Sequence, residues 1–144
     1  MLRSEIIDRL LAARGISPEE RDAFLHPSLS ALAAPEGLPG ITQAADVILA
    51  AVGAGRKIVV FGDYDCDGVC ATAILVKTIR ALGGADSVAA FIPDRLSEGY
   101  GMSDAAIARC LETNPGVGLV ITVDNGINSI EQIAALRKGA SRSS

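Results

Sequence analysis

The stretch Lys57–Gly68 reads KIVVFGDYDCDG, and the rest of the chain is organised around it. Four apolar residues and a glycine precede three acids, Asp63, Asp65 and Asp67, and no lysine or arginine lies between the acids. If the backbone stays extended past the glycine, the two-residue repeat of a strand puts all three carboxylates on one side. Three like charges so close together repel one another, and a bound cation is the usual remedy. The stretch therefore predicts a metal site at the carboxyl end of a strand.

Outward from this stretch, extended and helical patterns alternate. Apolar runs predict strands at 57–62, 88–92 and 117–123, and helical periodicity predicts helices at 42–53, 69–82, 104–112 and 129–138. Such alternation is typical of a parallel sheet covered by helices. We therefore predict an α/β fold with a Rossmann-like parallel sheet of about three strands, preceded by a small helical appendage.

Two of these helices have an apolar stripe that we expect to be buried. In the helix that starts at Thr42 the stripe consists of Ala45, Ile48, Leu49 and Val52. In helix 69–82 it consists of Ala73, Ile74, Val76, Ile79 and Leu82. Both stripes follow the helical repeat, which predicts that they face the sheet.

The first 40 residues have a different character, which suggests a domain boundary. Residues 2–13 have helical periodicity, Ser17 to Glu20 form a capping-box pattern before a short helix, and 33–40 is a Pro/Gly connector. We expect a helical lead-in at 1–40, the α/β domain at 41–139 and a tail at 140–144. His26, the one histidine, stands beside a proline at a helix end, and we interpret it as a cap or surface residue.

An acid after another predicted strand supports the predicted metal site. Asp124 follows the third predicted strand, as Asp63, Asp65 and Asp67 follow the first. In an open parallel sheet, ligands bind outside the carboxyl ends of the strands, so these acids are predicted to converge. The alternative is that Asp67 and Gly68 only cap the next helix while the other acids are solvated.

Two other interpretations of DYDCDG fail on single residues. An EF-hand calcium loop needs a glutamate at its twelfth position, where Ile74 stands, and it needs a helix rather than a strand before it. A haloacid-dehalogenase-type phosphatase resembles Asp65 to Gly68, but a threonine is expected next and Val69 stands there. Neither site is predicted here.

A loop between the second strand and the next helix contributes further candidates. It contains Arg95, which suits phosphate binding, and Gly99 and Gly101, which permit unusual backbone geometry. The residues alone are equally compatible with an ordinary turn that carries an exposed arginine. Asn125 and Gly126 likewise form a common turn dipeptide, so Asp124 before them is the more informative residue.

Composition limits the classes of function. The 144 residues are 49% hydrophobic with a mean hydropathy of +0.36, which favours a globular domain, and aromatic residues make up 3%. A net charge of −4 argues against a stand-alone DNA-binding surface but not against phosphate contacts made through a metal.

The sequence also suggests a location. Its amino-terminal segment does not look like a signal peptide, and no apolar run approaches the roughly 20 residues that span a bilayer, so we expect no membrane association. The three cysteines, Cys66, Cys70 and Cys110, lack zinc-site spacing and are best interpreted as reduced thiols. Together these features predict a cytoplasmic protein.

Three motifs in this order resemble the DHH phosphoesterase superfamily. GDYDCDG (62–68), PDRLSEGYG (93–101) and TVDNGI (122–127) are similar to its first, second and third motifs. RGISPEERDAFLHPSLSAL (14–32) resembles the helical segment that precedes the catalytic core in one branch. The GYG in the second motif favours that branch, bacterial exonucleases that degrade single-stranded DNA from the 5′ end in DNA repair and recombination.

The resemblance implies a role for each candidate. Asp65 and Asp67 would be metal ligands, Asp63 a ligand or its supporting partner, and Asp124 a bridge between two Mn²⁺ or Mg²⁺ ions roughly 3.5–4 Å apart. These four acids would be the catalytic set. The substrate, single-stranded DNA, would lie against Arg95, Gly99, Tyr100, Gly101, Asn125 and Gly126.

The chain also departs from the superfamily. The resemblance implies an Asp-His-His motif on a further strand, whereas this sequence ends at Ser144 and His26 cannot replace that motif. We therefore expect little or no exonuclease activity from these residues alone. The alternative is a non-catalytic module that binds a metal or nucleotide, or that forms a homo-oligomer through an exposed sheet edge.

Overall fold

The computed structural model describes residues 2–140, and the chain forms two compact units, Met1–Ile41 and Thr42–Ser144. The first unit consists of four short helical elements: α1 (Leu2–Ala13), α2 (Arg21–Leu25), η1 (Leu29–Ala31) and η2 (Pro35–Gly37). None of the helices in the described residues has the length and apolar content needed to cross a membrane.

A capping box precedes α2 in the first unit. The backbone N–H of Glu20 donates to Ser17 Oγ at 3.3 Å, and the N–H of Ser17 donates to Glu20 Oε2 at 3.0 Å. The side chain of Arg21 then reaches back to α1, where its Nε lies 2.7 Å from Asp8 Oδ1. This exposed ion pair links α2 to α1, and Leu11 of α1 is buried.

The second unit is an α/β domain. Its elements in chain order are α3 (Ile41–Gly53, whose first residue belongs to the first unit), β1 (Lys57–Phe61), α4 (Cys66–Ile79, continued by a wider turn over Arg80–Gly84), β2 (Val88–Phe91), α5 (Asp104–Thr113), β3 (Val117–Thr122) and α6 (Ile130–Ala140). The three strands form a parallel sheet in the order β2-β1-β3. The predicted parallel α/β architecture is confirmed.

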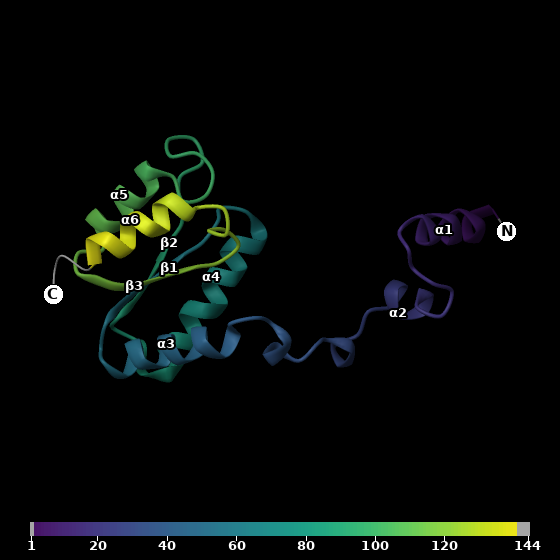
Figure 1. The fold of residues 1–144 in the computed structure, drawn as a ribbon, viewed down its shortest axis with the longest axis horizontal. Coiled ribbons are helices and arrows are strands. Elements are labelled where there is room, and N and C mark those ends of the chain that lie inside the picture. Colours follow the sequence, from purple (N-terminus) through teal and green to yellow (C-terminus); the bar gives the residue numbers. More distant parts are fainter. Residues whose placement is uncertain (1, 141–144) are drawn as a thin grey trace. The chain divides into compact units, whose positions relative to one another are not determined.

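β1 forms the centre of both halves of the core. Ile58 and Val60 pack into the apolar cluster below α3 and α4, whereas Val59 and Phe61 pack into the cluster below α5 and α6. Figure 1 shows the corresponding layers, with α3 and α4 on one face of the sheet and α5 and α6 on the other. All four side chains are at most 1% exposed, and burial of each contributes about 1.5–3 kcal/mol.

The predicted inward faces of two helices are partly wrong. α4 begins at Cys66 rather than at residue 69, and its buried residues are Gly68, Thr72, Val76 and Ile79. Ile74 and Leu82, which we expected to be buried, are 67% and 51% exposed, and Ala73 is exposed as well. In α3, Ala45 and Leu49 are exposed and Ala51 is buried instead. The inward face of α4 holds a glycine and a threonine because, near Asp63, the helix approaches β1 too closely for larger side chains.

The strand order fixes where a ligand can bind. The chain passes from β1 to β2 on one side and returns to β3 on the other side of β1. The connections therefore diverge between the carboxyl ends of β1 and β3, and open α/β sheets bind their ligands at such a point.

Candidate metal centre

Asp63 and Asp65 occupy the turn between β1 and α4. Asp63 is 2% exposed, and its Oδ1 accepts a hydrogen bond of 2.8 Å from the N–H of Tyr64. Asp65 is the N-cap of α4, where its Oδ1 accepts from the N–H of Gly68 at 3.0 Å. The start of the helix thus fixes one carboxylate, and burial at the end of the strand fixes the other.

Two glycines make this turn possible. A methyl group on Gly68 would lie 2.6 Å from the backbone nitrogen and oxygen of Asp63, and one on Gly62 would lie 2.0 Å from Thr72 Oγ1. Only a residue without Cβ allows this close approach of helix and strand. Gly62 and Gly68 therefore bring the first turn of α4 against the end of β1.

Asp124 reaches the same place from β3. Its φ is +59°, in the left-handed region that aspartate tolerates better than most residues. The next residue ties this turn to β1, because Asn125 Nδ2 donates to Val123 O at 3.2 Å and to Phe61 O at 3.5 Å. Gly126 follows with φ +96°, and a Cβ there would lie 2.7 Å from Thr122 Oγ1. The turn over 124–126 is thus fixed by its backbone geometry.

The two turns bring three carboxylates together. Oxygen atoms of Asp63, Asp65 and Asp124 lie within 4.8 Å of one another, and no ion pair within the described residues involves these acids. Asp124 is exposed, but loss of water around its carboxyl raises its pKa, and the charge of Asp65 and a hydrogen bond with Asp65 raise it further. The arrangement therefore concentrates negative charge, and no cation in the described part of the chain is paired with it.

Asp67, the remaining acid of the motif, lies apart from this group of three. Because α4 starts at Cys66, Asp67 belongs to the first helical turn and not to an extended segment. Its charge still contributes to the raised pKa of Asp124. The structure thus gathers Asp63 with Asp65 and Asp124, and its geometry favours Asp63 over Asp67 as the third donor.

The donor set suits a hard divalent cation. Carboxylate oxygens favour Mg²⁺ and Mn²⁺, whereas zinc prefers histidine and cysteine. Asn125 Oδ1 is buried and has no hydrogen-bond donor among the described residues, so an amide oxygen beside Asp124 also remains available. The exposed Cys66 and Cys70 lie outside the group.

The loop of the second motif places aromatic and cationic side chains near the acids. The Arg95 guanidinium lies 4.9 Å from the centre of the Tyr64 ring, and the rings of Tyr64 and Tyr100 meet edge to face at 6.2 Å. The charge of Asp63 raises the pKa of the Tyr100 phenol, with smaller effects from desolvation and Asp124. Arg95 and Tyr100 thus both contact Tyr64, which lies between Asp63 and Asp65 in the sequence.

The two predicted glycines of this loop, Gly99 and Gly101, determine its backbone conformation. Gly99 and Gly101 have φ of +82° and +68°, which most other residues rarely adopt. Tyr100 lies between them in the sequence and is 70% exposed.

Several residues that shape the site were not among the predicted site residues. Tyr64, Gly62 and Gly68 were in view within the motif, but their roles depend on contacts with Arg95, Thr72 and Asp63. The one available signal was the glycine on each side of the acids, because a glycine at a strand end and another at a helix start indicate close packing.

The chain is similar to known proteins in both sequence and structure. The model of the DHH family, N-terminal domain, matches residues 57–142. The single-stranded-DNA-specific exonuclease RecJ of Dickeya dadantii is 39% identical over 124 residues, which are 86% of this chain and 20% of that protein. RecJ of Haemophilus influenzae is 38% identical over 134 residues, which are 92% of this chain and 22% of that protein.

Two solved structures show the same fold. A manganese-bound exonuclease RecJ superimposes with a TM-score of 0.65 at 40% identity, over 76% of this chain and 27% of that one. RecJ from Thermus thermophilus in complex with Mn²⁺ gives a TM-score of 0.59 at 30% identity, over 93% of this chain and 19% of that one. The chain therefore spans about a fifth of the length of the curated relatives it matches. Since the family model covers more than half of its residues, the chain belongs to the DHH family.

Proposed function

We propose that this chain binds Mn²⁺ or Mg²⁺ through Asp63, Asp65 and Asp124 and contributes this centre to the hydrolysis of single-stranded DNA. The observation that carries the proposal is the convergence of three carboxylates from two strands within 4.8 Å, with no protein cation paired to them in the described residues. The relatives named above are single-stranded-DNA-specific exonucleases, and two structural neighbours contain manganese, which supports both parts.

Each candidate residue has a role in this proposal. A divalent cation at such a centre lowers the pKa of a bound water and offsets the charge of a phosphate. Asp67 supplements the negative charge that holds the cation, or serves as a further ligand. Arg95 suits a phosphate of the backbone, and the rings of Tyr64 and Tyr100 suit the stacking of bases. Asn125 and three glycines keep the loops open to the DNA: Gly99, Gly101 and Gly126.

The extent of activity follows from the share of the relatives that is matched. These 144 residues span about a fifth of the RecJ exonucleases they resemble. We propose that they bind the cation but degrade DNA little or not at all by themselves, and that the context is DNA repair and recombination. The free state of the three cysteines fits a reducing compartment, so we place the chain in the cytoplasm.

Calorimetric titration with Mn²⁺ tests the centre directly. The whole chain is expected to bind the ion, and Asp65→Ala and Asp124→Ala are expected to remove most of the binding heat. A parallel assay with 5′-phosphorylated single strands measures degradation at saturating Mn²⁺. Mn²⁺ binding that is unchanged in both variants would show that these acids do not form the centre, and rapid degradation by the wild type would contradict the low activity proposed for this chain.

A second candidate function rests on the sheet edge. β3 is an edge strand, and its apolar residues are only half-buried, in contrast to those of β1. An unpaired apolar edge favours pairing with another strand, here that of a second copy. In this case the chain is a non-catalytic module that binds a metal or nucleotide as a homo-oligomer. Sedimentation that finds only monomers would rule this out.

A further inference from the structure

An ion pair lies behind the loop that carries Arg95 and Tyr100, and it joins a nearly buried carboxylate to a partly exposed guanidinium. The carboxylate of Glu98 receives two hydrogen bonds from the guanidinium of Arg109 on α5, one from Nε to Oε1 and one of 2.7 Å from Nη2 to Oε2. The Glu98 side chain is 6% exposed, and Arg109 holds its pKa at about 2. The pair is therefore ionised and in a fixed geometry at any ordinary pH.

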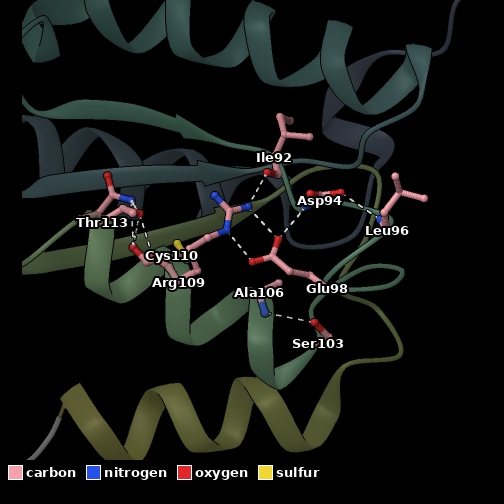
Figure 2. Close-up of polar contacts among 10 residues, drawn as sticks. Ile92, Asp94, Leu96, Glu98, Ser103, Ala106, Arg109, Cys110 and Thr113 are labelled. Carbon is pink, nitrogen blue, oxygen red and sulfur yellow. Dashed lines mark hydrogen bonds and ion pairs between the residues drawn. The ribbon is translucent and has the colours of Figure 1, made fainter.

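Arg109 in turn is fixed to the end of β2. Its Nη2 donates to Ile92 O at 3.0 Å, and its guanidinium lies 4.3 Å from the centre of the Phe91 ring. Figure 2 shows Arg109 extending from α5 between the Ile92 carbonyl and the Glu98 carboxylate. Through Arg109, Glu98 is therefore anchored to the end of β2 as well as to its own loop.

Glu98 also closes the turn that contains Arg95. Its Oε2 accepts from the N–H of Asp94 at 2.7 Å, and its own N–H donates to Asp94 O at 2.8 Å. Asp94 Oδ1 accepts from the N–H of Leu96 at 2.9 Å, so side chains bond the backbone on both sides of Arg95. The Glu98 carboxylate thus closes the turn from Asp94 to Glu98, which contains Arg95 and ends two residues before Tyr100.

The tip of the loop has few other contacts that could hold it in place. Leu96 is 96% exposed and Tyr100 is 70% exposed, so apolar burial does not hold the loop tip. Between Gly99 and Gly101, Tyr100 also has little restraint from its own backbone. Burial of Met102 holds the loop after Tyr100, and Glu98 is the anchor before it.

We infer that Glu98, anchored by Arg109, is a positioning residue that fixes Arg95 and Tyr100 beside the metal centre. The inference rests on the proposed function, because a DNA strand at the centre is what these two side chains would contact. The hydrogen bonds of Glu98 go to Arg109 and to the backbone of Asp94, and it acts on the metal centre through this turn and through Tyr100.

Nuclear magnetic resonance of the whole chain tests this inference without relying on activity. Tyr64 and Tyr100 are its two tyrosines, and it has no tryptophan, so the contact between the two rings can be assigned in a nuclear Overhauser spectrum. The variants are Glu98→Ala and Arg109→Met, which break the pair from either side. Glu112→Gln is the matched control, since it removes an exposed carboxylate from the same helix as Arg109. Unchanged amide signals of β1 and β3 verify the fold of each variant.

The ring contact is expected in the wild type and in Glu112→Gln, and it is expected to be lost in Glu98→Ala and Arg109→Met while the sheet signals stay in place. A ring contact that persists in either correctly folded variant would overturn the inference. If one variant does not fold, the other gives the answer from the opposite partner.

A second step separates this inference from the proposed function. Mn²⁺ is added, and its paramagnetic broadening of the Gly68 and Gly126 amide signals reports binding at the acids. Broadening of these amides in every variant supports the metal centre, and broadening of the Tyr100 ring that is weaker in Glu98→Ala and Arg109→Met than in the wild type and Glu112→Gln supports the role of Glu98. Absence of broadening at Gly68 and Gly126 in the wild type overturns the metal centre, and the ring contact then still decides the role of Glu98.

Discussion

Gly68 lies so close to Asp63 that a methyl group on the glycine would be 2.6 Å from the backbone nitrogen of the acid. The contact joins the first turn of α4 to the end of β1, and the same turn supplies the N–H that holds Asp65. Packing and metal binding therefore share one residue that has no side chain.

Replacing Gly68 by alanine is expected to disturb both the packing of α4 on β1 and the binding of the metal. The added Cβ meets backbone atoms that cannot rotate away, so helix and strand must separate, at a cost of about 1–3 kcal/mol for overpacking. Denaturant unfolding measures the stability, and calorimetry measures a loss of Mn²⁺ affinity. Gly53→Ala is the control, because a Cβ there meets nothing within 4 Å. A Gly68→Ala variant as stable as this control would contradict the packing argument.

Asp124→Asn separates charge from backbone conformation. Asparagine tolerates the left-handed φ of +59°, so the turn is expected to survive. Without metal the variant should be more stable than the wild type, because one of the repelling charges is gone. Addition of Mn²⁺ at a concentration of about a hundred times its Kd should stabilise the wild type by about 2.7 kcal/mol and the variant far less. Thermal unfolding with and without the ion gives both values, and equal metal-induced shifts would exclude Asp124 as a ligand.

Low pH should lower the stability of the folded chain through protonation of Glu98. The Arg109 guanidinium lowers the pKa of this carboxyl from 4.5 to about 2 in the folded state, so the unfolded chain binds the extra proton first. The stabilisation by the ion pair is therefore complete above pH 4.5 and is lost as the pH falls towards 2. Urea unfolding across this range should show the stability difference between wild type and Glu98→Gln shrinking with acid. The difference between wild type and Glu112→Gln should show no such trend.

The three thiols should divide into two classes. Cys66 and Cys70 are exposed, whereas Cys110 is 2% exposed and burial raises the pKa of its thiol to about 11. Because the thiolate is the reactive form, a thiol reagent should modify two cysteines in the native chain and three after unfolding. Cys110→Ala should leave the native count at two and lower the unfolded count to two. Three fast-reacting thiols in the native wild type would show that α5 is not packed as described.

Much of the fold could be predicted because its signals are local. β1 is a continuous apolar run that ends in a glycine, and the acids that follow it and β3 are adjacent to those runs in sequence. Alternation of strands and helices then requires parallel pairing, which places Asp63 and Asp124 at one edge. What the sequence does not specify is the order β2-β1-β3, since either neighbour of β1 satisfies the same pattern.

The helix faces were harder to predict because they depend on distances between elements. Thr72 is 3% exposed although it is polar, and Ile74 is 67% exposed although it is apolar, because α4 turns the face with Gly68, Thr72, Val76 and Ile79 towards the sheet. The helix also starts at Cys66, so Asp65 is its N-cap and Asp67 lies in its first turn. A periodicity of hydrophobic residues has no information about how closely two backbones approach.

The bond from Asn125 Nδ2 to Phe61 O joins residues 64 positions apart. Contacts of such sequence separation form late and slowly, since the entropy of closing a long loop is lost before the contact is made. The acidic group therefore does not exist in a chain emerging from the ribosome until β3 has paired with β1. A cation that requires Asp63 and Asp124 together binds only the finished sheet, so metal uptake would report the completion of folding.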